Sequence, residues 1–172
     1  MKWEVFVPVL GDTAVVAGRS MAGLAAAAAL SPHFTNVVVV DKDPDHDTDE
    51  PRAGVGQGRH YHALAQGAVG ALERLLPGAV ADLRAEGAVE VPFALGIRFY
   101  DAGQWQPNRD LGFTSLNAMR GLTENVTYRR LRHNPNVQFR GNCRVEHLLF
   151  DDEGTRAAED RCQAVVRIHG AG

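Results

Sequence analysis

The chain has few cysteines: only Cys143 and Cys162 occur among its 172 residues. Two cysteines are too few for a disulfide framework, and these two lack C-x-x-C spacing. We therefore expect reduced, partly buried thiols.

An excess of positive charge is also missing. The sequence has 18 Lys and Arg against 21 Asp and Glu, a net charge of -3 and a pI of about 6.1. This balance gives no electrostatic case for a nucleic-acid partner or an anionic membrane surface. No apolar run approaches the length of a membrane span, and Glu4 and Pro8 interrupt the hydrophobic region that a signal sequence would need. We expect a cytoplasmic protein without a membrane span.

The composition that is present, 45% hydrophobic and 23% charged, is typical of one globular domain with a sizeable core. Residues 1–12 form a short leader in which Trp3, Val5 and Val7 alternate, so the leader either adds an edge strand or stays loose. We place the domain itself at residues 13–172.

A strand, a glycine turn and a helix open this domain. Residues 14–17 are small or β-branched, Gly18 interrupts them, and Met21–Leu30 contains five consecutive alanines before Ser31-Pro32 ends the helix. Asn36 turns the chain into a second strand, the valine run 37–40. A strand, a glycine turn and the unpaired amides of a helix start together favour a bound phosphate.

The spacing follows the dinucleotide fingerprint G-x-G-x-x-G, with Gly18, Ser20 and Gly23 at its three positions. The middle glycine is a serine, which is small enough for close approach and adds a hydroxyl. Asp41 ends the valine run about twenty residues later, where an acid binds ribose hydroxyls. The alternative is an ordinary βαβ unit whose glycines serve packing alone.

An acidic segment, D-K-D-P-D-H-D-T-D-E, occupies residues 41–50. A calcium loop needs glycine at its sixth position and glutamate at its twelfth, and no register of this segment supplies both. We interpret it as a solvated acidic loop and count only Asp41, with its neighbour Lys42, among candidate cofactor contacts.

A second glycine-rich segment covers residues 50–62, with glycines at positions 54, 56 and 58. Arg52 and Arg59 flank these glycines, and guanidinium groups suit phosphate contacts or stacking on a flat ring. His60 and His62 have no third ligand at a useful spacing, so we predict no metal site. We expect both histidines to open the next helix and to face the cofactor or its access route.

The remaining elements are predicted from periodicity and turn residues. We expect helices at 61–76 and 79–86, a hairpin built from strands 89–91, 97–100 and 104–105, a helix at 116–133, and strands at 137–140, 144–150 and 162–168 with a polar loop at 151–160. Leu122, Val126 and Leu131 supply the buried face of the long helix. Its carboxyl-terminal arginines need no ligand, whereas Arg120 in its first turn is a candidate flavin or phosphate contact.

The order of G-x-S-M-A-G-L, V-V-V-D, P-R-A-G-V-G-Q-G-R-H and M-R-G-L-T-E resembles the amino-terminal half of the FAD-dependent monooxygenases. This family includes enzymes of the para-hydroxybenzoate hydroxylase type and bacterial flavin hydroxylases and epoxidases, and the resemblance covers residues 13–168. It implies an α/β fold, a Rossmann-like βαβ FAD-binding domain with an added β-hairpin or meander. It also implies a set of cofactor contacts: Gly18, Ser20, Met21 and Gly23 at the pyrophosphate, Asp41 at the adenosine ribose with Lys42 beside it, Arg52 and Arg59 in the loop, and Arg120 on the later helix.

The activity implied by the resemblance is oxygen transfer. NAD(P)H reduces the flavin, dioxygen adds to give a hydroperoxide, and its terminal oxygen goes to a small organic substrate. The family's later aspartate–glycine element, its G-D motif and its substrate-binding sheet do not occur before Gly172. We therefore expect an incomplete chain that binds FAD weakly or not at all and does not turn over, and we assign no catalytic residue.

Two other interpretations stay open. The glycine turn alone would allow an NAD(P)-binding reductase with a Rossmann fold, although the R-A-G-V-G-Q-G-R segment argues against it. The chain would also suit a non-catalytic nucleotide-binding module that acts with a partner supplying a second half.

Overall fold

The computed structural model describes residues 8–45, 56–146 and 166–168 of the chain. These residues belong to two compact units: Met1–Asp47 with Leu131–Gly172, and Thr48–Arg130. The domain boundary placed between residues 12 and 13 stays a prediction. Within the described ranges, no helix combines the length and apolar character that crossing a membrane requires.

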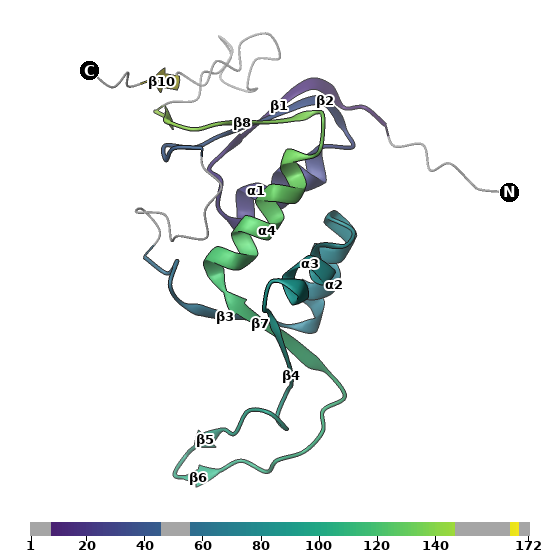
Figure 1. Cartoon of the computed structure of the whole chain (residues 1–172), viewed down its shortest axis with the longest axis vertical. Coiled ribbons are helices and arrows are strands. Elements are labelled where there is room, and N and C mark those ends of the chain that lie inside the picture. The colour runs from purple at the N-terminus through teal and green to yellow at the C-terminus, as the bar shows by residue number, and fades with distance from the viewer. Residues whose placement is uncertain (1–7, 46–55, 147–165, 169–172) are drawn as a thin grey trace, which may run out of the picture. The chain divides into compact units, whose positions relative to one another are not determined.

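The first unit contains a parallel sheet of three strands, β1 (Gly11–Ala17), β2 (Phe34–Val40) and β8 (Val137–Arg140), with β2 in the middle. Helix α1 (Met21–Leu30) connects β1 to β2 and packs against both strands (Figure 1). The predicted mixed α/β fold with a strand–helix–strand opening is therefore confirmed. The second strand begins at Phe34, so the turn predicted at Asn36 is wrong by two residues.

The alanine-rich sequence of α1 explains how closely the helix approaches the sheet. Gly23, Leu24, Ala27 and Ala28 are its buried residues. They meet Val37 and Val39 of β2, which are also buried, at a face built from small or β-branched side chains. The helix ends at Ser31, as predicted, where the Ser31 N–H donates to the carbonyl oxygen of Ala27 at 3.0 Å.

A two-stranded antiparallel pair, β9 (Cys143–Val145) and β10 (Val166–Ile168), also belongs to the first unit. It overlaps the strands predicted at 144–150 and 162–168 only in part, and the rest of those segments and the 151–160 loop lie outside the described residues. Cys143 is a buried free thiol, in agreement with the prediction, whereas Cys162 lies outside the described ranges.

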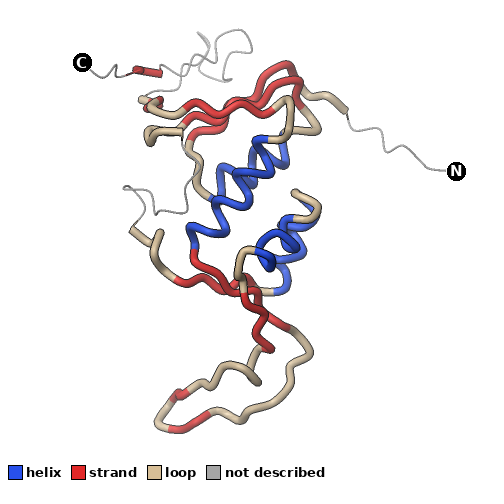
Figure 2. The backbone as a smooth tube through the Cα atoms, viewed as in Figure 1, coloured by secondary structure: helices blue, strands red, loops and turns tan. Residues whose placement is uncertain are grey.

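The second unit contains an antiparallel sheet in which β7 (Thr114–Met119) lies between β3 (Tyr61–Leu64) and β4 (Val89–Pro92). Helices α2 (Gln66–Leu75), α3 (Ala79–Ala85) and α4 (Arg120–Arg132) follow or precede these strands (Figure 2). The core cluster of this unit consists of Leu72, Ala79, Val80, Leu83, Ala88, Leu116, Ala118 and Val126. The buried face predicted for the long helix is confirmed, because Val126 and Leu131 are buried and Leu122 packs against this cluster.

Two predicted helix starts are wrong. Residues 61–64 and 116–119 form β3 and β7, so the helices begin at Gln66 and Arg120. His60 and His62 therefore do not open a helix: His60 ends a turn and His62 lies on β3. The physical reason is the antiparallel pairing of β3 with β7, two segments that lie far apart in the sequence. The hydrogen bonds and packing of this pair outweigh the local helix propensity of both segments.

A small hairpin is formed by β5 (Tyr100–Asp101) and β6 (Gln104–Trp105). The predicted hairpin is thus confirmed in part, because only Tyr100 of the predicted strand 97–100 is in it and the predicted strand 89–91 pairs with β7 instead. Its two turn residues, Ala102 and Gly103, both have positive φ angles, 48° and 80°. Tyr100 and Trp105 are exposed and contact each other edge to face.

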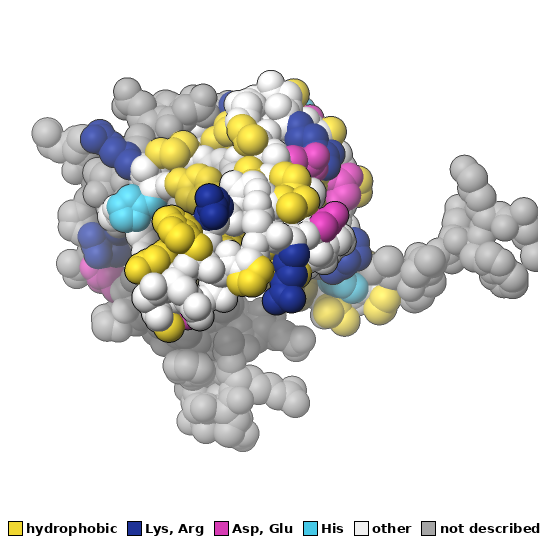
Figure 3. Space-filling model, turned by 90° about the horizontal axis from the view of Figure 1, so that it is seen from below, with side chains coloured by type: hydrophobic (Ala, Val, Ile, Leu, Met, Phe, Trp, Pro, Cys, Tyr) yellow, Lys and Arg dark blue, Asp and Glu magenta, His cyan; other side chains and the backbone are white. Residues whose placement is uncertain are grey.

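Exposed hydrophobic side chains also lie among basic ones on the face of the molecule shown in Figure 3.

Candidate functional site

The glycine turn at the carboxyl end of β1 has the backbone geometry that the fingerprint predicts. Gly18 has a φ of +98°, a conformation that L side chains rarely adopt, and its N–H donates to the carbonyl oxygen of Val40 at 2.8 Å. A Cβ added at Gly23 would overlap the carbonyl oxygen of Gly18. The third glycine is thus required for close packing of the helix on the turn.

The amino end of α1 has no side-chain cap. Ser20 is the N-cap residue, with extended backbone at φ -77° and ψ 175°, and its side chain makes no capping hydrogen bond. The Leu24 N–H donates to the Ser20 carbonyl oxygen at 2.9 Å, and the first turn has no acidic residue. The amides of this turn, which include Met21, form the kind of end that binds an anion.

Asp41 lies beside this turn at the carboxyl end of β2 and is 8% exposed. Its Oδ2 accepts the Arg19 backbone N–H at 2.5 Å, and its Oδ1 accepts the Asp43 N–H at 2.9 Å. The structure therefore brings the predicted ribose acid and the glycine turn into direct contact. Lys42 is half exposed and pairs with Asp43 at 3.0 Å.

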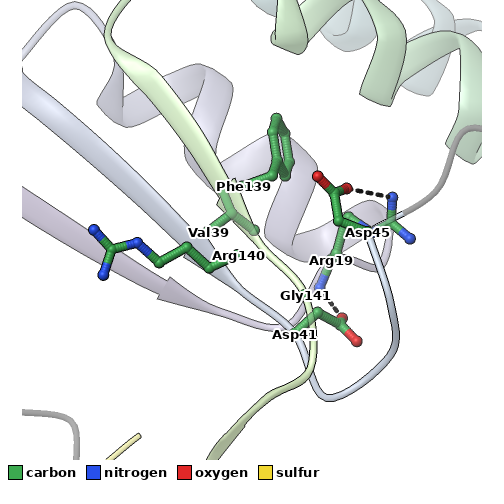
Figure 4. A pocket seen from close by; sticks show the side chains of 7 residues that line it. All are labelled: Arg19, Val39, Asp41, Asp45, Phe139, Arg140 and Gly141. Carbon is green, nitrogen blue, oxygen red and sulfur yellow. Dashed lines mark hydrogen bonds and ion pairs between the residues drawn. The ribbon is translucent and has the colours of Figure 1, made fainter. Parts of the chain in front are cut away.

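A shallow hollow lies next to this contact, lined by Arg19, Val39, Asp41, Asp45, Phe139, Arg140 and Gly141. Figure 4 shows the Arg19 side chain reaching Asp45, while Arg140 points away from that pair. Arg19 lines this hollow, and the sequence analysis did not select it as a candidate. The fingerprint gives no signal for this residue, because it leaves the position after its first glycine unspecified.

The second unit holds the other predicted contacts. Arg120 begins α4, and its Nε donates to Glu124 Oε1 at 2.9 Å while its Nη1 donates to Gln57 Oε1 at 3.3 Å. Its backbone N–H donates to the His60 carbonyl oxygen at 3.1 Å. The structure thus joins Arg120 to the glycine-rich segment, on which Arg59 is exposed.

Arg52, the other arginine of that segment, lies outside the described residues. Among the residues that the structure describes, no group of three or more His, Cys, Asp and Glu could hold a metal ion. The Arg19–Asp41 contact belongs to the first unit and the Arg120–Gln57 contact to the second, and each is established within its own unit.

Comparison with known sequences gives a partial relative. No protein-family model matches the chain. Protein Rv3254 of Mycobacterium tuberculosis strain H37Rv is 40% identical over 76 residues, which make up 44% of this chain and 16% of that protein. The match therefore covers a small part of the mycobacterial protein's length.

Solved structures match a larger part of the chain. p-Nitrophenol 4-monooxygenase PnpA from Pseudomonas putida DLL-E4 has a TM-score of 0.59 and 23% identity, over 86% of this chain and 35% of PnpA. PqsL from Pseudomonas aeruginosa, described as a probable FAD-dependent monooxygenase, has a TM-score of 0.60 and 14% identity, over 86% of this chain and 36% of PqsL. The chain thus spans about a third of these proteins, and it shares its fold with the amino-terminal portion of the FAD-dependent monooxygenases, as the sequence resemblance predicts.

Proposed function

We propose that the chain is the nucleotide-binding part of an FAD-dependent oxidoreductase of the flavin monooxygenase type, either a hydroxylase or an epoxidase. The observation that carries this proposal is the uncapped amino end of α1 behind Gly18, joined by the Arg19–Asp41 hydrogen bond to an acid at the end of β2. This arrangement supports a phosphate site at the start of α1 and a ribose site at Asp41, as a Rossmann-like unit would have.

The residues of the first unit fit the AMP half of FAD. The backbone at Gly18, Ser20, Met21 and Gly23 would hold the diphosphate, and the Asp41 carboxylate at the end of β2 would accept hydrogen bonds from the ribose hydroxyls. Lys42 lies next to Asp41, with its ammonium group partly exposed to solvent. In the second unit, Arg120 and Arg59 would contribute positive charge, and the proposal extends this role to Arg52.

FAD would supply the redox chemistry, with NAD(P)H as reductant, dioxygen as oxidant and a small organic molecule as substrate. The protein's own contribution is to bind the nucleotide, to orient it and to exclude water from the reacting atoms. Oxygen transfer is proposed by similarity to solved monooxygenases, about a third of whose length this chain spans.

Calorimetric titration with FAD, FMN, NADH and NADPH tests the proposal. We expect FAD to bind more tightly than NADH or NADPH, and FMN to show no measurable binding because it lacks the adenosine. Asp41→Asn should weaken FAD binding about tenfold, since it removes a charged acceptor of ribose hydroxyls. Asp12→Asn is the matched control, because Asp12 is exposed on β1 in the same unit.

Two outcomes would replace the proposal. Preference for NADH or NADPH over FAD would favour a Rossmann reductase. Binding of none of the four, together with capture of a second flavoprotein subunit that restores binding, would favour a module that acts with a partner.

A further inference from the structure

Arg19 is a buried cation inside the glycine turn. It is 7% exposed, its Nη1 lies 3.5 Å from Asp45 Oδ1, and its Nη2 donates to the Pro44 carbonyl oxygen at 3.2 Å. Its backbone N–H meanwhile donates to Asp41. One residue of the turn therefore contacts three positions of the acidic segment that follows β2.

The acidic segment is also held from the other side, at the end of β8. A Cβ added at Gly141 would overlap the backbone nitrogen of Asp45 and would lie 2.9 Å from the Asp43 carbonyl oxygen. The Asn142 N–H donates to that same oxygen at 3.0 Å. Residues 43–45 are thus packed between Arg19 and the backbone at 141–142, in the arrangement that Figure 4 shows around the hollow.

This arrangement places negative charge beside the proposed diphosphate site. Asp41, Asp43 and Asp45 follow one another at alternate positions, and the first of them touches the glycine turn. A diphosphate at the start of α1 would be repelled by these carboxylates, and the repulsion would be strong where side chains are shielded from water. The guanidinium of Arg19 is the positive charge that the turn itself supplies next to them.

We propose that Arg19 is a positioning and charge-compensating residue for the dinucleotide: by pairing with Asp45 it fixes the acidic segment and offsets its repulsion of the diphosphate. This inference rests on the proposed function, because it assumes a diphosphate at the start of α1. It assigns a role to a position that the fingerprint leaves unspecified.

The test compares Arg19→Met with the unaltered chain by following amide chemical shifts during FAD titration. We expect about tenfold weaker FAD binding at low ionic strength, the size expected for losing a charged hydrogen-bonding group. This loss of affinity should shrink as NaCl is raised from about 20 mM to about 500 mM, because salt screens the repulsion between the carboxylates and the diphosphate that Arg19 no longer offsets. Arg19→Lys should retain most of the affinity.

Arg74→Met is the matched control, because it removes the same charge from an exposed position on α2. Unchanged affinity in Arg19→Met, or a deficit independent of salt, would overturn the inference. If the methionine variant does not fold, Arg19→Gln removes the charge and keeps a hydrogen-bond donor for the Pro44 carbonyl.

A measurement without nucleotide separates this inference from the proposed function. Hydrogen exchange at the amides of Asp43 and Asn142 should be faster in Arg19→Met, because both amides bond within the segment that Arg19 holds. A chain that binds no FAD would overturn the proposed function, and faster exchange would still establish that Arg19 fixes the segment. Unchanged exchange would overturn that role of Arg19 whatever the FAD result.

Discussion

At the scale of single residues, Glu73 on α2 connects two helices of the second unit. Its carboxylate accepts the backbone N–H of Gly78 at 2.6 Å and that of Val80 at 3.1 Å, so it caps the amino end of α3 from outside that helix. These two backbone hydrogen bonds, helped by Arg130 and Arg84, lower the pKa of Glu73 below its ordinary value of 4.5.

The lowered pKa predicts a pH-dependent effect of Glu73→Gln. A carboxylate whose folded pKa is depressed stabilises the fold fully above 4.5 and loses this contribution as the pH falls through the folded value. The difference in unfolding free energy between the unaltered chain and Glu73→Gln should therefore shrink as the pH falls below 4.5. Urea unfolding at a series of pH values measures this difference.

Glu90→Gln is the control for that series, because Glu90 is exposed and accepts a hydrogen bond from the Arg84 side chain at 2.5 Å rather than from a backbone amide. A difference for Glu73→Gln that stays constant with pH would contradict the capping role.

Asn117 has a comparable role inside the sheet of the second unit. It is 5% exposed on β7, and its Nδ2 donates to the carbonyl oxygens of Ser115 and Val89, at 2.9 and 3.1 Å. Its Oδ1 accepts a short hydrogen bond from the Tyr61 hydroxyl. The side-chain amide of Asn117 is thus hydrogen-bonded to a residue on each of the three strands of this sheet.

We predict that Asn117→Ala destabilises the fold by about 2 kcal/mol, because buried partners lose their hydrogen bonds. Asn108→Ala, at an exposed position in the loop after β6, should change stability by less than about 0.5 kcal/mol. Chemical denaturation measures both values, and equal effects of the two substitutions would contradict the assignment of Asn117 as the connection between the strands.

At the scale of elements, α1 and α2 use glycine for different reasons. Gly23 of α1 faces the carbonyl oxygen of Gly18, and nothing but hydrogen fits there. Gly67 of α2 has no atom within 4 Å of an added Cβ. The first glycine is a packing requirement of the turn, and the second only weakens its helix.

The same substitution should therefore have opposite effects in the two helices. Gly23→Ala should destabilise the fold by about 2 kcal/mol, because backbone must shift to admit the methyl group. Gly67→Ala should stabilise it by about 0.5 kcal/mol through helix propensity. Thermal unfolding of both variants decides the point, and a neutral Gly23→Ala would show that the turn and helix are packed less closely than described.

The elements also show what a sequence can predict. The alanine run of α1 and the valine run of β2 carry strong local signals, and Met21–Leu30 was predicted with both ends correct. Leu116 and Met119 favour a helix equally well on local grounds, yet they belong to β7, whose pairing partners lie 22 to 58 residues away along the chain, Pro92 opposite Thr114 and Tyr61 opposite Met119 among them. Such pairing leaves no local trace in the sequence.

The sequence likewise predicts only some of the residues that the structure brings together at the candidate site. Gly18, Gly23 and Asp41 follow from spacing, because a fingerprint fixes positions along one βαβ unit. Arg19 could not be predicted, since its partners Pro44 and Asp45 are set by how the chain leaves β2 and packs on Gly141. Contacts of this kind depend on the fold and not on spacing.

At the scale of the whole molecule, the chain matches 86% of its own length to about a third of each solved monooxygenase that we compared. The glycine turn and Asp41 belong to its first compact unit, and Arg59 and Arg120 belong to its second. What the chain shares with these solved structures is the fold.

The most direct test of the central claim is a map of backbone amide shifts in the 172-residue chain during titration with FAD. We expect the amides of Gly18, Ser20, Met21 and Asp43 to shift together along one binding curve, because the proposed diphosphate and ribose sites lie at the start of α1 and beside Asp41. Shifts confined to other elements, such as the β5–β6 hairpin, or no shifts at all, would contradict it.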